Sequence, residues 1–203
     1  MTILISGKTG YISNYIKNWL MGHGLTDKDI QLKGLRNVEW EKESLKGVDV
    51  FIHCAATVHK RKATEEEFIR VNTELTINLA RKAKEEGVKQ FIFMSTKGVY
   101  GLKKNCFHEV IIDESTPINP FKNYGISKYL AEQALLDIQD ETFKVAIIRA
   151  PFIYGKGCPG NYQLLRKMVL KYRFVPKLAS KMSFLYIDNL CELILQIIEQ
   201  HRD

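Results

Sequence analysis

Short apolar runs alternate with longer segments of helical periodicity along almost the whole chain. Strands are expected at residues 2–6, 29–33, 37–40, 48–53, 90–95 and 144–149. Helices are expected at residues 12–21, 64–86, 123–140, 162–172 and 189–200, with Thr64 as an N-cap and Gly87 as a stop. The strongest strands are nearly continuous apolar runs, which indicates a sheet covered on both faces. Alternating strands and helices therefore predict βαβ units in a doubly wound α/β fold with a parallel sheet.

Composition narrows the classes of protein that this chain can belong to. It has 203 residues, of which 45% are hydrophobic and 26% are charged, enough for one domain with its own core. No apolar run approaches the roughly 20 residues of a membrane-spanning helix. The first residues are typical of a strand and not of a signal peptide, so we expect a cytoplasmic protein with no membrane partner. Four widely spaced cysteines contain no CxxC pair, so no metal site is expected.

The net charge of +7 suits an anionic partner. The basic residues are scattered and often stand beside acids, as in 82–86, and no basic stripe with interleaved aromatics is found. Nucleic acid is therefore not expected as a partner. A small molecule that carries phosphate groups would match the same charge.

A glycine-containing turn follows the first strand and opens the first helix. Gly7 and Gly10 frame it, Thr9 lies between them, and Tyr11 and Ile12 begin the helix. Glycines allow a tight turn and let the backbone approach a pyrophosphate, while the helix N-terminus offers free N–H groups and a positive dipole end. The turn therefore predicts a dinucleotide-binding site made by these five residues.

Tyr124 and Lys128 carry the strongest chemical signal in the chain. They are four residues apart and share one face of a predicted helix. An ammonium close to a phenol lowers the phenol pKa toward the working range, so the tyrosine can exchange a proton with a substrate oxygen. Ser95 and Thr96 end the strand that precedes this helix and offer hydroxyl groups.

Together these motifs resemble the extended short-chain dehydrogenase/reductase family, which includes NAD-dependent epimerases and dehydratases of nucleotide sugars. Gly7 and Gly10 match the first two glycines of the family's turn. Ser13 replaces the third glycine, a change expected to loosen the first helix. Aligned on 99–101 (Val-Tyr-Gly), Thr96 takes the catalytic Ser/Thr position and is expected to hydrogen-bond the substrate oxygen.

The resemblance also implies roles for residues in several other segments. Asp188 matches a family aspartate and would equally suit a helix N-cap. The implied cofactor-binding residues outside the glycine turn are Arg36, Cys54, Ala55, Ala56, Asn72, Ser95, Tyr124, Lys128, Ala150 and Pro151, and the implied substrate-binding residues are Thr96 and Asn161.

The cofactor is expected to be NAD or NADP. NAD-selective members usually place an acid at the end of the second strand, for the adenosine ribose hydroxyls. Lys33 and Arg36 stand in that region instead. They suit the 2′-phosphate of NADP, and they suit solvent equally well, so the choice between the two cofactors stays open.

The resemblance implies a Rossmann domain with the catalytic residues at 1–157. A small or truncated C-terminal substrate lobe with a returning strand and helix is implied at 158–203. Family members usually continue further, so the chain is either a fragment or has an unusually small lobe. Members commonly dimerise through helices equivalent to 64–86 and 123–140, so a homodimer is expected.

Several functions fit these residues. A 4,6-dehydratase places Asp-Glu directly after its catalytic threonine, where this chain has Lys97-Gly98. A 4-epimerase needs only Thr96, Tyr124, Lys128 and a tightly held NAD. A UDP-hexose 4-epimerase for surface-polysaccharide precursors is therefore favoured, with a nucleotide sugar as the substrate. An NADPH-dependent reductase of nucleotide-4-keto sugars and a non-catalytic dinucleotide sensor or scaffold remain as alternatives.

Overall fold

The computed structural model describes residues 1–35, 39–58, 63–102, 110–173 and 182–200. Five parallel strands form the central sheet in the order β2-β1-β3-β4-β5. They are β1 (Ile3–Ser6), β2 (Ile30–Lys33), β3 (Val50–His53), β4 (Gln90–Thr96) and β5 (Lys144–Ala150). β1 and β3 are buried along their whole length, as their apolar runs require. The predicted α/β fold with a parallel sheet is confirmed.

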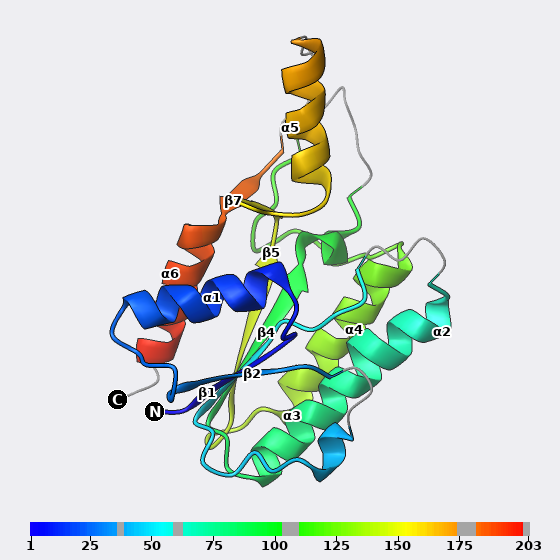
Figure 1. Ribbon diagram of the computed structural model, residues 1–203. Coiled ribbons are helices and arrows are strands. Elements are labelled where there is room, and N and C mark those ends of the chain that lie inside the picture. Colours follow the sequence, from blue (N-terminus) through cyan, green and yellow to red (C-terminus); the bar gives the residue numbers. More distant parts are fainter. Residues whose placement is uncertain (36–38, 59–62, 103–109, 174–181, 201–203) are drawn as a thin grey trace.

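Helices cover both faces of the sheet (Figure 1). They include α1 (Tyr11–Gly22) and α6 (Ile187–Gln200) on one face, and α3 (Leu75–Glu85) and α4 (Asn123–Ile138) on the other. Each face has its own apolar core. Ile5 lies in the core beneath α1 and α6, whereas Phe91 lies in the core beneath α3 and α4.

The order in which strands are added to the sheet reverses at β1, although all five strands run parallel. From β1 the chain passes to β2 on one side, and it then returns to place β3 on the other side. In open parallel sheets of this kind, ligands bind beside the carboxyl ends of the strands at such a reversal. The topology therefore predicts a ligand site beside the segments that follow β1 and β3.

Two local expectations differ from the structure. A strand was expected at 37–40, of which the structure describes residues 39 and 40. This expectation is wrong there, because Trp40–Lys42 forms the 3₁₀ helix η1. The single helix expected at 64–86 is divided into α2 (Glu65–Phe68), the π-helix η2 (Ile69–Glu74) and α3. Its N-cap is confirmed, since the Thr64 hydroxyl accepts a hydrogen bond from the Glu67 N–H at 3.3 Å.

A smaller unit lies beyond the carboxyl end of the sheet (Figure 1). Two short parallel strands, β6 (Phe152–Tyr154) and β7 (Phe184–Tyr186), flank α5 (Asn161–Tyr172) in the sequence. After β7, α6 returns to the main sheet and packs against α1. The hydroxyl of Tyr15 on α1 donates to the carboxylate of Asp188 at 2.7 Å. Asp188 lies in the first turn of α6 and not at its N-cap.

Among the described helices, none is both long and apolar enough to cross a bilayer.

Candidate active site

The turn after β1 is shaped to receive an anionic group. Gly7 has a φ of +93°, and a Cβ there would lie 3.4 Å from the backbone nitrogen of Ala55, so the turn and the end of β3 are in close contact. The N-terminus of α1 has neither a side-chain cap nor an acidic residue in its first turn. Thr9 and Gly10 are exposed at the tip, and Tyr11 and Ile12 begin the helix. The uncapped N–H groups and the dipole therefore face outward, as an anion-binding turn requires.

Ser13 stabilises this turn, contrary to the expectation that it loosens the first helix. The side chain is fully buried, and its hydroxyl bonds the carbonyl oxygen of Gly7 and, at 3.0 Å, that of Gly10. A Cβ on Gly10 would lie 3.0 Å from the Ser13 oxygen, so glycine at one position accommodates serine at the other.

His53 ties the end of β1 to the end of β3. Its Nδ1 accepts from the Ser6 hydroxyl at 2.8 Å, and the Ser6 oxygen accepts from the backbone N–H groups of Cys54 and Ala55, both at 3.1 Å. His53 Nε2 lies 3.0 Å from the Thr76 hydroxyl, which itself donates to the Asn72 carbonyl. Because the Thr76 proton is used there, Nε2 carries the imidazole proton and Nδ1 is the acceptor.

Asn72 continues this network toward the helix that carries Tyr124. It lies fully buried in the π-helix. Its side-chain oxygen accepts from the Thr57 N–H at 2.8 Å, and its nitrogen donates to the Thr57 carbonyl at 3.0 Å and to the Ser127 hydroxyl at 3.1 Å. Ser127 in turn donates to the Tyr124 carbonyl at 3.0 Å. Hydrogen bonds through His53, Thr76 and Asn72 therefore connect Ser6, the residue before the glycine turn, to the first turn of α4.

Close backbone packing brings the segment after Thr96 against the start of α4, which carries Tyr124. Thr96 ends β4, and its hydroxyl accepts from the Gly98 N–H at 3.1 Å, which begins the 3₁₀ helix η3 (Lys97–Tyr100). Gly125 follows Tyr124 on α4, and a Cβ there would lie 2.7 Å from the Gly98 carbonyl oxygen. Only glycine at position 125 lets α4 approach η3 this closely.

The electrostatics of Tyr124 and Lys128 differ from the expectation drawn from their spacing. Burial raises the pKa of Tyr124 to about 12, whereas a lowered pKa was expected. Burial lowers the pKa of Lys128 to about 7. The Lys128 nitrogen lies 3.8 Å from the centre of the Phe93 ring, and no hydrogen bond joins it to Tyr124 or to another described residue. Both residues lie on α4 as expected, but burial is what shifts the pKa of Tyr124, and it shifts it upward.

A buried acid on α4 was missed by the sequence analysis. Glu132 is fully buried one turn after Lys128, and Arg149 on β5 donates to it from Nε at 3.1 Å and from Nη2 at 2.8 Å. The Ser95 hydroxyl also bonds this carboxylate. The spacing of four residues from Lys128 was the available signal, because it places an acid on the same buried face. Ser95 thus directs its hydroxyl toward α4, whereas Thr96 is only half-buried.

The remaining expected residues fall into two groups. Cys54, Ala55 and Ala56 follow β3 beside the glycine turn, and Ala150 pairs with Thr96 in the sheet, with Pro151 immediately after it. Burial raises the pKa of the Cys54 thiol to about 12, so it is a neutral neighbour of Lys128. Arg36 lies outside the described residues. Asn161 begins α5, and its side chain is likewise outside the description.

These features fit a dinucleotide. The exposed tip of the glycine turn lies beside the uncapped N-terminus of α1, whose N–H groups and positive dipole end suit a pyrophosphate. The buried Lys128 ammonium has no hydrogen-bond acceptor among the described residues, and ribose hydroxyls would supply one.

Comparisons with known proteins agree with this geometry. The UDP-glucose 4-epimerase of Vibrio cholerae is 31% identical over 230 residues, which cover 98% of this chain and 66% of that protein. The N-acetyl-α-D-glucosaminyl-diphospho-ditrans,octacis-undecaprenol 4-epimerase of Escherichia coli O157:H7 is 31% identical, covering 81% of this chain and 50% of its own length. The chain thus spans about half to two thirds of these curated relatives.

Solved structures share the fold at lower identity. The UDP-glucuronic acid 4-epimerase of Bacillus cereus, solved with NAD, has a TM-score of 0.74 at 19% identity and covers 98% of this chain and 73% of its own. The dTDP-glucose 4,6-dehydratase of Streptomyces venezuelae, also solved with NAD, has a TM-score of 0.76 at 21% identity, with coverages of 98% and 72%. Enzymes with different reactions therefore share this architecture.

The model of the NAD dependent epimerase/dehydratase family matches residues 3–203. The chain belongs to that family.

The buried imidazole makes folding stability depend on pH. Burial, with a smaller contribution from Lys128, lowers the pKa of His53 from 6.5 to about 3. Between these values the unfolded chain binds a proton that the folded chain does not. The free energy of unfolding is therefore expected to fall as the pH falls below 6.5, by up to about 1.4 kcal/mol per pH unit from this group.

Urea unfolding at pH 7.5, 6.5 and 5.5 measures this dependence of the free energy of unfolding on pH. His53→Asn should flatten the dependence, and the exposed control His23→Asn should keep it; equal slopes in all three proteins would contradict the assignment.

Gly125→Ala tests the packing of α4 against η3. The new Cβ would meet the Gly98 carbonyl oxygen at 2.7 Å. Overpacking costs roughly 1–3 kcal/mol, which exceeds the up to about 1 kcal/mol that alanine gains over glycine inside a helix. We expect a lower free energy of unfolding by chemical denaturation. The control is Gly22→Ala at the end of α1, where a Cβ meets nothing within 4 Å and stability should be equal or higher. Equal behaviour of the two variants would show that the contact is unimportant.

Proposed function

We propose that this chain is the cofactor-binding and catalytic part of an NAD-dependent nucleotide-sugar 4-epimerase. The substrate we propose is a UDP-hexose, used for the synthesis of surface-polysaccharide precursors. The relatives from Vibrio cholerae and Escherichia coli are both named 4-epimerases, which supports the reaction, and the second name specifies a sugar linked through a diphosphate to undecaprenol.

The observation that carries the proposal is the composition of the site around Thr96. The next residues are Lys97 and Gly98, and Gly98 is packed against Gly125, so no acid follows Thr96. Tyr124 is the proton-transfer group that we assign to the site, since it begins α4 where that helix packs against the segment after Thr96. One tyrosine suffices for reversible oxidation of an alcohol, whereas elimination of water needs a further acid and base.

The residues of the chain have distinct tasks in this reaction. NAD, when bound, supplies a reversible hydride acceptor. Tyr124 removes the proton from the substrate O4. It returns the proton after the oxidised sugar has rotated in the site and presents its other face. Thr96 donates a hydrogen bond to the same oxygen and fixes its position. Lys128 stabilises the phenolate, which is necessary because burial alone holds the phenol pKa at about 12.

No observation in the described part of the chain favours the NADPH-dependent reductase. The same catalytic residues would serve that reaction, and its NADPH preference would need Lys33 and Arg36 to meet a 2′-phosphate. Lys33 forms an ion pair with Glu43, and Arg36 is outside the described residues. A non-catalytic dinucleotide sensor would not need Tyr124 and Lys128 on one face beside Thr96.

The first test is the nucleotide that the purified protein carries. An epimerase returns the hydride in every cycle and keeps its cofactor, so denaturation should release NAD in near-stoichiometric amount. Chromatography and absorbance identify and quantify the released nucleotide. A nucleotide-free protein that binds NADPH more tightly than NADH would instead establish the reductase.

Tyr124→Phe tests the proton-transfer step. Removal of a general acid–base group lowers kcat by about 10²–10⁴-fold. We expect that loss in the interconversion of UDP-glucose and UDP-galactose, with the amount of bound NAD unchanged. The matched control is Tyr129→Phe on the same helix, at a residue to which we assign no role in the site, and it should retain full turnover. Undiminished turnover by Tyr124→Phe would place the chemistry elsewhere.

A further inference from the structure

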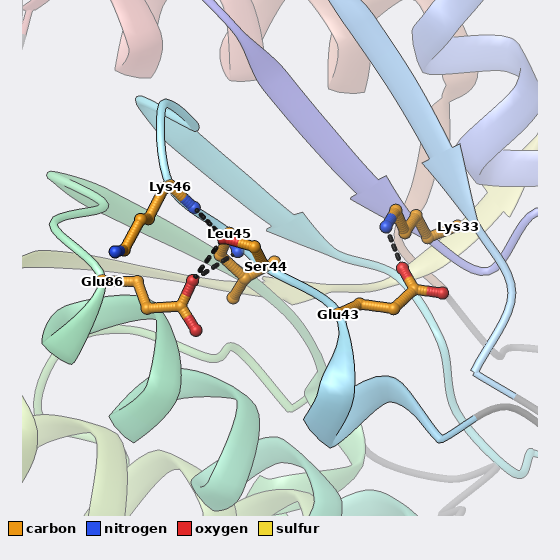
Figure 2. Close-up of polar contacts among 6 residues, drawn as sticks. All are labelled: Lys33, Glu43, Ser44, Leu45, Lys46 and Glu86. Atoms are coloured by element: carbon orange, nitrogen blue, oxygen red, sulfur yellow. Dashed lines mark hydrogen bonds and ion pairs between the residues drawn. The ribbon is translucent and has the colours of Figure 1, made fainter.

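An ion pair occupies the edge of the site where the second strand ends. Lys33 is the last residue of β2, and its carbonyl oxygen accepts from the N–H groups of Gly7 at 2.8 Å and Lys8 at 3.2 Å. The residue is therefore attached directly to the anion-binding turn. Its ammonium meets the carboxylate of Glu43 (Figure 2).

Glu43 is brought to this place by a segment anchored to the far end of α3. Its backbone N–H donates to the Trp40 carbonyl at 3.1 Å, which closes η1. The residues after it are held by Glu86, whose carboxylate accepts from the Leu45 N–H at 2.5 Å and from the Ser44 hydroxyl at 3.1 Å (Figure 2). The contact with Lys82 and then the bonds from Leu45 and Ser44 lower the pKa of Glu86 to about 2, so the anchor is charged at neutral pH.

The pair is accessible from solvent. The side chain of Lys33 is 30% exposed and that of Glu43 is 37% exposed. Ion pairs with this exposure contribute little to folding stability. The position of the pair is more informative than its strength, because in dinucleotide-binding folds the end of the second strand lies against the adenosine ribose.

The chemistry of the two side chains distinguishes the two dinucleotides. A carboxylate accepts hydrogen bonds from ribose hydroxyls and repels a phosphate. A free lysine attracts a phosphate. Here the lysine comes from the strand and the carboxylate from ten residues further on, and each neutralises the other.

We propose that Glu43 is the cofactor-selectivity residue of this chain. Its carboxylate accepts from the ribose 2′-hydroxyl and holds the Lys33 ammonium, so NAD(H) is bound in preference to NADP(H). The inference concerns the adenosine end of the cofactor and holds whichever reaction the nicotinamide end supports.

Calorimetric titration of the nucleotide-free full chain with NAD⁺ and with NADP⁺ tests this assignment. Wild type should bind NAD⁺ more tightly. Glu43→Gln should lower the ratio of the two affinities roughly tenfold, the scale of one charge-assisted hydrogen bond, through weaker NAD⁺ and tighter NADP⁺ binding. Lys33→Met in the Glu43→Gln background should abolish the gained NADP⁺ affinity.

The matched control is Glu39→Gln. Glu39 also pairs with a lysine, Lys42, but both side chains are more than 70% exposed. The charge change is the same, and the affinity ratio should equal that of wild type. A wild-type preference for NADP⁺ would overturn the proposal, and so would a Glu43→Gln ratio equal to that of Glu39→Gln. Because only binding is measured, failure of the epimerase assignment would leave this result unaffected.

Discussion

The buried hydrogen bonds centred on His53 are the constraint on which the site depends. The imidazole is fully buried and joins Ser6 at the end of β1 to Thr76 on α3, while Ser6 also holds the backbone after β3. Burial keeps the imidazole neutral, and a neutral ring has one donor and one acceptor, which the network uses in a single arrangement. A buried network in which every group is satisfied fixes relative positions more sharply than apolar packing does.

The π-helix follows from the same constraint. Asn72 must reach the Thr57 backbone with both ends of its amide and must also reach Ser127 on α4. A wider helical turn at this point places the amide between the two elements, and π-turns often occur where a functional side chain needs such placement. The end of β1, beside the glycine turn, and the helix of Tyr124 and Lys128 are thereby joined by one set of buried hydrogen bonds.

Within the described part of the chain, the charged groups behind the site are arranged so that no carboxylate forms an ion pair with Lys128. The Glu132 carboxylate lies on the same helix, but it is bonded to Arg149 and Ser95. The lysine is therefore left beside the Phe93 ring with a lowered pKa. The Lys128 ammonium can therefore donate hydrogen bonds to groups that enter the site. This agrees with its proposed role of stabilising a phenolate and a ribose.

The fold class, the five strands of the central sheet, the glycine turn and the positions of Tyr124 and Lys128 on one helix could be predicted from the sequence alone. Each of these follows from local hydrophobic periodicity or from the spacing of residues along one element. The tertiary structure decided the π-turn at Asn72, the burial that raises the pKa of Tyr124, and the pairing of Lys33 with Glu43. The strands β6 and β7 were also beyond the sequence, since each has only three residues and is defined by its partner about thirty residues away. The physical reason is common to all of them: burial, ion pairs and strand pairing depend on groups that only the folded chain brings together.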